Sequence, residues 1–225
     1  MNDATALEVR DLGLIPYEEA LALQSELIER RRSGDIPDQL LLLQHPRVIT
    51  LGTASSPSHI LADESRRRDL GIDLFDVGRG GDVTYHGPGQ LVAYPILDLK
   101  PDRRDVHRYL RDLEAVLVRA LDRIGIRGEP IPDLTGVWVE GRKIAAIGVR
   151  VSSGWITSHG FALNVSNDLS YFDTIVPCGI QDVSVTSVTQ ELGRPVEVAD
   201  IVGIVSEAFS EIFGRSMRAA AQPTS

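Results

Sequence analysis

Cys178 is the only cysteine in this 225-residue sequence and the first candidate for chemistry. A single cysteine excludes an intrachain disulfide, and such a residue is often a small buried hydrophobe. Here Pro177 and Gly179 flank it, which predicts a tight turn at the end of a strand. A thiol at such a turn can face a cleft, where nearby backbone N–H groups form an oxyanion hole. Cys178 is therefore a candidate nucleophile.

Lys143 is the second candidate, because only Lys100 and Lys143 among the 23 basic residues are lysines. Lysine can give up its proton when it is desolvated, whereas arginine effectively never does. Alternation along KIAAIGV predicts that Lys143 shares a strand face with Ala145 and Ile147, and the opposite face is apolar too. We therefore expect a partly desolvated lysine. The alternative is a solvated residue at the mouth of a hairpin.

The segment RGGDVTYHGPGQ, residues 79–90, is the third candidate, since it holds 4 of the chain's 20 glycines. Glycine lets the backbone approach a ligand closely and leaves N–H groups free to donate. The segment is not a P-loop or a dinucleotide fingerprint, because neither spacing is present. It is interpreted as a binding loop or as a long hairpin loop that needs positive φ angles.

The five histidines are His45, His59, His86, His107 and His159. His107 falls in a helical pattern and is expected at the surface. His86 and His159 lie beside glycines in predicted loops, where either could pair with a cysteine, so the residues alone leave a Cys–His and a Cys–Lys pair open. Neither Cys-x-x-Cys nor His-x-x-x-His spacing occurs, and we expect no zinc site.

The elements that must position these residues follow from periodicity and from turn residues. Strands are expected in runs, with helices at the start, middle and end of the chain, which indicates an α+β fold with a mixed or antiparallel sheet and packed helices. The expected helices run from about Pro16 to Arg30–Arg32, with Leu21, Leu23, Leu27 and Ile28 as its apolar stripe, and over 105–124 and 198–213. The expected strands are two around His45-Pro46, then 74–77, 90–99, a hairpin turning at Gly141-Arg142, and WITSHGFALNV.

Composition limits the class of protein. The chain has 43% hydrophobic residues, a net charge of −9 and a pI near 5.0, which argues against a nucleic-acid coat or a basic membrane-surface binder. The first residues lack the pattern of a signal peptide, and no apolar run reaches the ~18 residues of a membrane span. We expect a cytoplasmic monomer with one domain over 1–218, a possible small lobe from about 180, and a frayed tail over 219–225.

Four of these motifs together resemble the lipoyl(octanoyl) transferase family. They are RGGDVTYHGPGQ, GRKIAAIGV, SHGFALNV, and VPCGI followed by SVTS, and they occur in the family's order between about 45 and 210. The resemblance implies the fold of the biotin/lipoate protein ligase catalytic domain. It also implies transfer of an octanoyl group from acyl carrier protein to a lysine of a lipoyl domain, the first step of protein lipoylation.

The resemblance assigns roles to individual residues. It makes Cys178 the nucleophile that carries the acyl thioester and Lys143 the general acid and base that favours the thiolate of Cys178. It implies no cofactor and no metal. Its partners are octanoyl acyl carrier protein as donor, and the lipoyl domains of 2-oxoacid dehydrogenases and the glycine cleavage H protein as acceptors. Substrate contacts fall on Arg79, Gly80, Gly81, Asp82, Val83, Thr84, Tyr85 and His86, on Ala146, Ile147 and Gly148, and on Gly160, Phe161 and Ala162.

Three other functions remain as alternatives. An ATP-dependent lipoate–protein ligase has the same fold and also uses a lysine and a glycine-rich loop, but it needs no cysteine nucleophile. A non-catalytic module that binds an acyl group or a carrier protein would need neither Cys178 nor Lys143. A Cys–His hydrolase would use water as the acceptor in place of a lysine.

Overall fold

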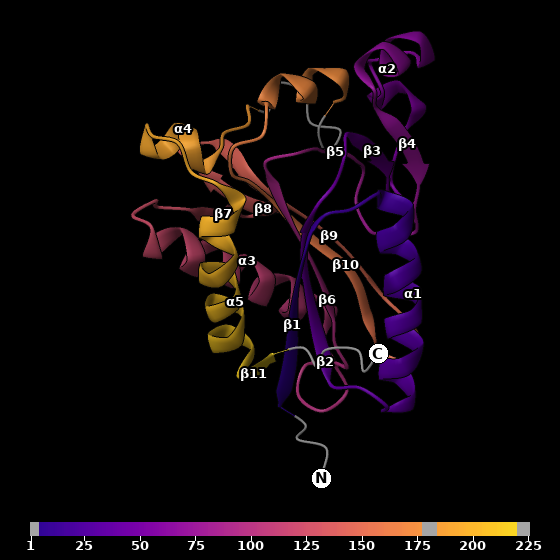
Figure 1. The fold of residues 1–225 in the computed structure, drawn as a ribbon, viewed down its shortest axis with the longest axis vertical. Helices are drawn as coiled ribbons and strands as arrows, with labels where there is room; N and C mark the ends of the chain where they lie inside the picture. The colour runs from indigo at the N-terminus through magenta and orange to yellow at the C-terminus, as the bar shows by residue number, and fades with distance from the viewer. Residues whose placement is uncertain (1–4, 177–183, 220–225) are drawn as a thin grey trace.

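The computed structural model of the chain describes residues 5–176 and 184–219, and it combines a large sheet, a small sheet and packed helices (Figure 1). The large sheet has the strand order β11-β1-β2-β6-β10-β9-β8-β7. β1 pairs in parallel with β2 and β11, and the other neighbours are antiparallel. Its strands are β1 (Ala6–Leu14), β2 (Asp38–Gln44), β6 (Gln90–Ile96), β7 (Glu129–Ile131), β8 (Leu134–Val139), β9 (Arg142–Val151), β10 (Thr157–Asn164) and β11 (Ser216–Ala219).

The small sheet has the order β4-β3-β5. Its strands are β3 (Val48–Leu51), β4 (Asp73–Asp76) and β5 (Val83–His86). The helices of the chain are α1 (Tyr17–Ser33), α2 (Glu64–Leu70), α3 (Val106–Arg123), α4 (Val188–Leu192) and α5 (Val198–Phe213), with 3₁₀ turns η1 (Pro57–His59) and η2 (Leu169–Thr174). The mixed sheet with packed helices confirms the predicted fold class.

Alternation along the central strands divides the core into two layers. Leu40 and Leu42 of β2 join the core cluster that α3 and α5 cover, whereas Leu41 and Leu43 join the cluster beneath α1. In Figure 1, α3 and α5 accordingly lie on one side of the large sheet and α1 on the other. The possible lobe from about residue 180 contributes α5 to the first of these clusters.

The predicted helices agree closely with the observed ones. α3 and α5 occupy the expected residues, and α1 ends at Ser33 before Gly34, whose φ of 82° makes a left-handed cap. The expected stripe of α1 was wrong in part. The buried side chains are Tyr17, Ala20, Gln24 and Leu27, and the predicted Leu21, Leu23 and Ile28 are only partly buried.

Four strands, β1, β5, β7 and β11, were not predicted. β5 lies inside the glycine-rich segment that we interpreted as a loop, and β1 and β11 pair with each other at one edge of the large sheet. Ala219, assigned from sequence to the tail, is the last residue of β11. The predicted hairpin of β8 and β9 is present. It turns at Glu140 and Gly141, which both have positive φ, as a tight two-residue hairpin requires.

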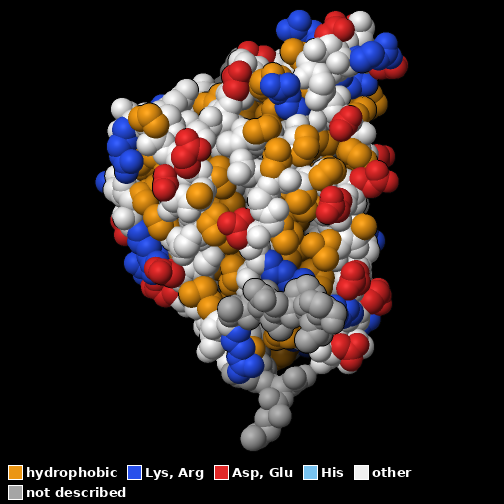
Figure 2. Space-filling model, viewed as in Figure 1, with side chains coloured by type: hydrophobic (Ala, Val, Ile, Leu, Met, Phe, Trp, Pro, Cys, Tyr) orange, Lys and Arg blue, Asp and Glu red, His pale blue; other side chains and the backbone are white. Residues whose placement is uncertain are grey.

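The exposed surface carries both signs of charge. Figure 2 shows acidic and basic side chains interspersed on one face, around hydrophobic side chains along its middle. Among the described residues, no helix combines the length and the apolar character that crossing a membrane would require.

Candidate active site

A cavity lies on the α1 side of the large sheet, above the strands β6, β10 and β9. Two adjoining pockets form it and share Thr84, Ala146 and Ala162 in their walls. One pocket includes Lys143, Gln90 and Asn164, and the other extends to Tyr94, Tyr17 and His159. The cavity therefore runs along the strands from a lysine at one end to two tyrosines at the other.

Lys143 reaches this cavity because β9 contains a bulge. Val137 pairs with Ala145 and Trp138 with Lys143, so one extra residue of β9, Ile144, interrupts the alternation. Lys143 consequently lines the cavity with Ala146, and the predicted face shared with Ala145 was wrong. The expectation that Lys143 is desolvated was correct, since its exposure is 5%. Its ammonium lies 4.7 Å from the centre of the Trp138 ring, within the range of a cation–π contact.

The chain that follows Cys178 is attached to the backbone of Lys143. The Lys143 N–H donates to the carbonyl of Ser184 at 2.8 Å, and the Thr186 N–H donates to the carbonyl of Lys143 at 3.0 Å. On the other side of the segment, the Val176 N–H donates to the carbonyl of His59 at 2.8 Å. Cys178 itself lies outside the described residues.

A buried network of amides surrounds the lysine end of the cavity. The Gln90 side-chain amide donates to Asn164 Oδ1 at 2.9 Å and to the Tyr85 carbonyl, and Gln90 Oε1 lies 2.7 Å from His86 Nδ1. Asn164 donates in turn to the carbonyl of Thr186. Because the Gln90 oxygen can only accept, His86 carries its proton on Nδ1. The network fixes the walls beside Lys143 and leaves no charge on them.

Arg79 holds the glycine-rich segment against the strands. Its guanidinium is buried and donates to the hydroxyl and carbonyl of Thr50 and to the carbonyl of Gly80. A Cβ on Gly52 would lie 2.8 Å from Arg79 Nη1, and one on Gly148 would lie 3.1 Å from Arg79 Cδ. Glycine at these two positions therefore lets the arginine pack beside the cavity.

Two histidines of the cavity wall, His86 and His159, and His45 behind them are neutral at pH 7. Burial lowers the pKa of His45 to about 4, burial and His45 lower the pKa of His86 to about 3, and burial and Arg79 lower the pKa of His159 to about 4. His86 ends β5 and His159 lies within β10, so the prediction that both occupy loops was wrong. His159 has a φ of 54°, and its N–H donates to Gln24 of α1.

Two tyrosines close the other end of the cavity. The Tyr94 hydroxyl lies 2.9 Å from His45 Nε2, and His45 Nδ1 lies 2.9 Å from the carbonyl of Ile15. A carbonyl can only accept, so His45 Nδ1 carries the proton and Tyr94 donates to Nε2. The Tyr17 hydroxyl interacts with that of Tyr94, and burial raises the pKa of Tyr17 to about 12. Both tyrosines are therefore neutral donors held in one orientation.

Most of the substrate residues implied by the resemblance meet at this cavity. Gly80 and Tyr85 are not part of its wall: Gly80 bonds to Val149, and Tyr85 stacks on Tyr171 beneath the small sheet. The other implied residues do line the cavity: Arg79, Gly81, Asp82, Val83, Thr84, His86, Ala146, Ile147, Gly148, Gly160, Phe161 and Ala162.

Sequence reasoning missed several residues of the site. Gln90 and Asn164 lie inside quoted motifs, HGPGQ and ALNV, and a search for buried amides there would have found them. Tyr17, Tyr94 and Trp138 gave no signal, because an aromatic residue in an apolar helix or strand is ordinarily part of the core.

Comparison with known proteins supports the family suggested by the motifs. Residues 16–210 match the lipoyl protein ligase A/B catalytic domain. The chain is 56% identical over 211 residues to an octanoyltransferase of Rubrobacter xylanophilus, covering 93% of this chain and 95% of that protein. It is 50% identical over 209 residues to an octanoyltransferase of Solibacter usitatus, covering 93% and 94%.

The fold also matches a solved structure. Lipoate-protein ligase A bound with ATP superposes with a TM-score of 0.77 at 19% sequence identity, covering 96% of this chain and 87% of that one. At this identity the likeness concerns the fold. The family match and the relatives confirm the resemblance drawn from the four motifs, and the chain belongs to the lipoyl protein ligase A/B catalytic domain family, among its octanoyltransferases.

Proposed function

We propose that this protein transfers an octanoyl group from acyl carrier protein to a lysine of a lipoyl domain, through a thioester on Cys178. The observation that carries the proposal is the cavity itself. Apolar residues such as Ala146 of β9 and Ala162 of β10 line it, and a buried lysine, Lys143, lies at one end. An acyl chain needs such a wall, and a thioester exchange needs a group that can move protons. The octanoyltransferase relatives support the same reaction.

In the first half-reaction, the Cys178 thiolate attacks the carbonyl carbon of the octanoyl thioester. The bond from that carbon to the carrier sulfur breaks, and the Lys143 ammonium gives a proton to the departing thiolate. The product keeps the energy of a thioester, so little free energy is lost when the acyl group moves to the enzyme.

In the second half-reaction, neutral Lys143 takes a proton from the ammonium of the acceptor lysine. The free amine attacks the acyl carbon, the nitrogen releases its second proton to solvent as the amide forms, and the bond to the Cys178 sulfur breaks so that the thiolate leaves. Lys143 is then an ammonium again, which restores the starting state. The Ser184–Lys143 hydrogen bond supports this pairing, because Ser184 is only six residues after Cys178 in the sequence.

The histidines contribute little as bases in this proposal. A base with a pKa of about 3 or 4, as in His86 and His159, is weak at neutral pH. Their neutral state instead suits an apolar acyl chain, since no desolvated imidazolium faces it. The proposed setting is the reducing cytoplasm, where a thiol nucleophile stays free.

An ATP-dependent ligase is the second candidate, because lipoate-protein ligase A with bound ATP shares the fold. The two functions differ in their need for a nucleotide and for a cysteine. Mixing the protein with octanoyl carrier protein, without ATP or magnesium, should add one octanoyl mass to the intact chain, and hydroxylamine should remove it. Cys178→Ala should gain no mass. An adduct that persists in Cys178→Ala, or a strict need for ATP and free octanoate, would overturn the proposal.

A further inference from the structure

The strand register divides the cavity into levels along its length. Gln90 of β6 pairs with Asn164 of β10 at the lysine end, and Val92 pairs with Ala162 two residues further on. Tyr94 is the next residue of β6 on the same face, and Gly160 is the next of β10. Four residues at about 3.4 Å each give about 14 Å from the first level to the Tyr94 level.

That distance can be compared with an acyl chain. Three backbone bonds of an extended residue advance about 3.6 Å, so an extended chain advances about 1.2 Å per bond. The seven carbon–carbon bonds of an octanoyl chain then span about 8–9 Å. A chain that starts beside Lys143 therefore ends about 5 Å from the Tyr94 level, close to van der Waals contact with the rings there.

No side chain from β9 or β10 fills the Tyr94 level. Gly148 and Gly160 pair with each other there; Arg79 and the Gly80 carbonyl pack beside Gly148, and the Ala93 carbonyl lies beside Gly160. The space is limited instead by the rings of Tyr94 and Tyr17, which are both 4% exposed. These two rings therefore border this end of the cavity, with Arg79 and His159 beside them.

The two rings are held from several sides. Tyr17 packs on His45 with ring centres 4.9 Å apart and on Phe75 at 5.2 Å, and Tyr94 meets the ring of His159 at 6.2 Å. Their hydroxyls point into the chain of hydrogen bonds through His45 to the carbonyl of Ile15, whose own N–H bonds to Gln44 of β2. A ring held in this way cannot rotate aside to admit a longer acyl chain without breaking these hydrogen bonds.

We infer that Tyr94 and Tyr17 form the end wall of the acyl cavity and set its preference for an eight-carbon chain. The inference rests on the proposed octanoyl transfer. A shorter acyl chain does not reach the tyrosine rings and loses that contact, and a longer acyl chain must displace a buried, hydrogen-bonded ring. The wall thus penalises both errors in length.

The test is a series of carrier-protein donors with six-, eight-, ten- and twelve-carbon chains. Each methylene that gains an apolar contact is worth about fourfold in binding, so Tyr94→Ala should raise the decanoyl-to-octanoyl ratio of kcat/KM by about tenfold or more. Tyr17→Ala opens the same wall from α1 and should change the ratio in the same direction. Tyr94→Phe keeps the ring and should keep the preferred length.

A matched control is Tyr109→Leu, since Tyr109 is equally buried but belongs to the core beneath α3. It should leave the ratio unchanged, which separates loss of the wall from general loosening. Circular dichroism and thermal unfolding identify the folded variants. Folded Tyr94→Ala and Tyr17→Ala proteins that both retain the octanoyl preference would overturn the inference.

Binding of the free acids separates this inference from the proposed function. Calorimetric titration with octanoate and decanoate needs no transfer reaction. If the wild type transfers nothing from any donor, but Tyr94→Ala binds decanoate at least tenfold more tightly relative to octanoate, the proposed function fails and the wall stands. If that ratio is unchanged, the wall is wrong whatever the activity.

Discussion

Two buried polar clusters lie at opposite ends of β2 and are stabilised in different ways. The ionic cluster centres on Asp38, whose carboxylate lies 2.7 Å from Arg31 Nε and 2.9 Å from Arg215 Nε. Arg215 also contacts Asp102, and that hydrogen bond, the largest contribution, lowers the pKa of Asp102. The neutral cluster, at the other end, consists of Tyr17, Tyr94, His45, His86 and His159.

The difference shows what each cluster is suited to do. In the ionic cluster, opposite charges and hydrogen bonds offset the cost of removing each ion from water, which leaves a closed and strongly coupled joint. In the neutral cluster, the histidines avoid that cost by staying unprotonated. Uncharged rings can border a cavity that takes an apolar chain, whereas unpaired ions cannot. The first cluster is therefore expected to govern stability, and the second to govern ligand binding.

The largest expected effect is on catalysis at the cavity. Lys143→Arg retains a cation beside Trp138, but arginine cannot release its proton near neutral pH. Loss of a general acid–base group typically costs about 10²–10⁴-fold. We expect acyl-enzyme to form while transfer to the lipoyl domain falls by that factor, as measured by single-turnover kinetics of the two steps. Near-normal transfer would reduce Lys143 to an electrostatic role.

The ionic cluster should give the largest effect on stability. Asp38→Asn removes the charge between Arg31 and Arg215, and breaking a buried pair costs about 3–5 kcal/mol. Urea unfolding at pH 7 should show a loss of free energy of unfolding in that range. The specific acylation rate of the folded fraction should stay near the wild-type value. A loss of unfolding free energy below about 1 kcal/mol would mean that the ion pairs of Asp38 stabilise the fold no more than exposed ion pairs do.

The neutral cluster should make stability depend on pH. The folded-state pKa values of His45, His86 and His159 are about 4, 3 and 4, below the ordinary 6.5, so the unfolded chain binds more protons as the pH falls below 6.5. The stabilisation is complete above pH 6.5 and is lost on acidification towards pH 4. Each histidine adds up to about 1.4 kcal/mol per pH unit to the slope.

A single substitution isolates one histidine. His45→Asn should reduce the slope of unfolding free energy against pH, between pH 6 and 5, by about 1.4 kcal/mol per unit at most. His107→Asn is the control, since His107 is exposed on α3 and should leave the slope unchanged. Equal slopes in the wild type and His45→Asn would mean that His45 is protonated in the folded protein.

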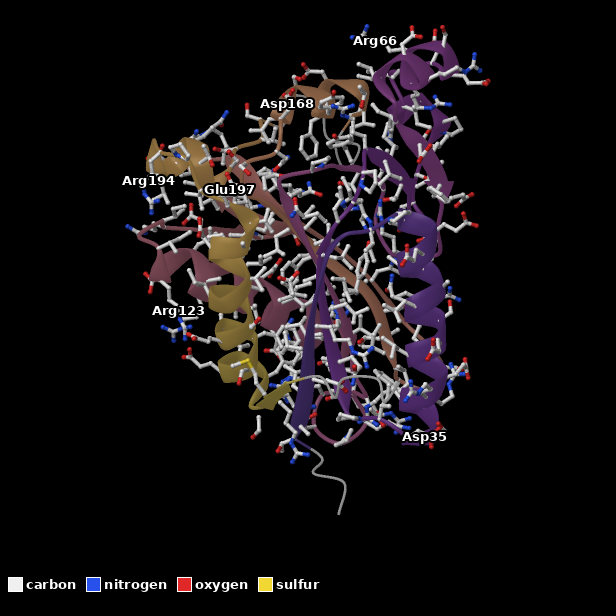
Figure 3. All side chains as sticks on the ribbon, in the orientation of Figure 1. Asp35, Arg66, Arg123, Asp168, Arg194 and Glu197 are labelled. Carbon is white, nitrogen blue, oxygen red and sulfur yellow. The ribbon has the colours of Figure 1, made fainter. Side chains whose placement is uncertain are left out.

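The smallest effect is expected for an ion pair in solvent, a third setting for charge. Arg123 of α3, labelled in Figure 3, contacts Glu207 and Glu211 of α5 at 2.7 and 2.9 Å, but all three side chains remain partly exposed to water, at 32%, 65% and 45%. Arg123→Ala should change the free energy of unfolding by about 0.5 kcal/mol, and less at high salt. A loss as large as that of Asp38→Asn would contradict the distinction between buried and exposed pairs.

The elements predicted well from sequence were those with strong local signals. The apolar stripe of α3 and the glycines that cap α1 and turn the β8–β9 hairpin act within a few residues of one another. β1 and β11 carry no such signal, because their stability comes from pairing with each other and with β2. β5 has only four residues, too few for alternation to be recognised.

The parts of the site that lie within sequence motifs could be predicted. The glycine-rich segment and Lys143 were identified from composition, and the family supplied most of the residues around the cavity. The bulge at Ile144 could not be predicted, since it depends on the register between β8 and β9. The contact between Tyr17 and Tyr94 could not be predicted either, because it depends on how α1 packs on β6.

The pairing of β1 with β11 has a consequence for the order of folding. Arg215 reaches Asp38 across 177 residues of sequence, and β11 follows Arg215 directly. Contacts between such distant residues close a long loop and form slowly. During synthesis, β1, α1 and β2 leave the ribosome long before Arg215 and β11. Until these are made, β1 is unpaired at one edge of the sheet and Asp38 lacks its ion pair with Arg215. Final closure of that edge should therefore be the last step of folding, and a nascent chain is most exposed to wrong pairing at β1.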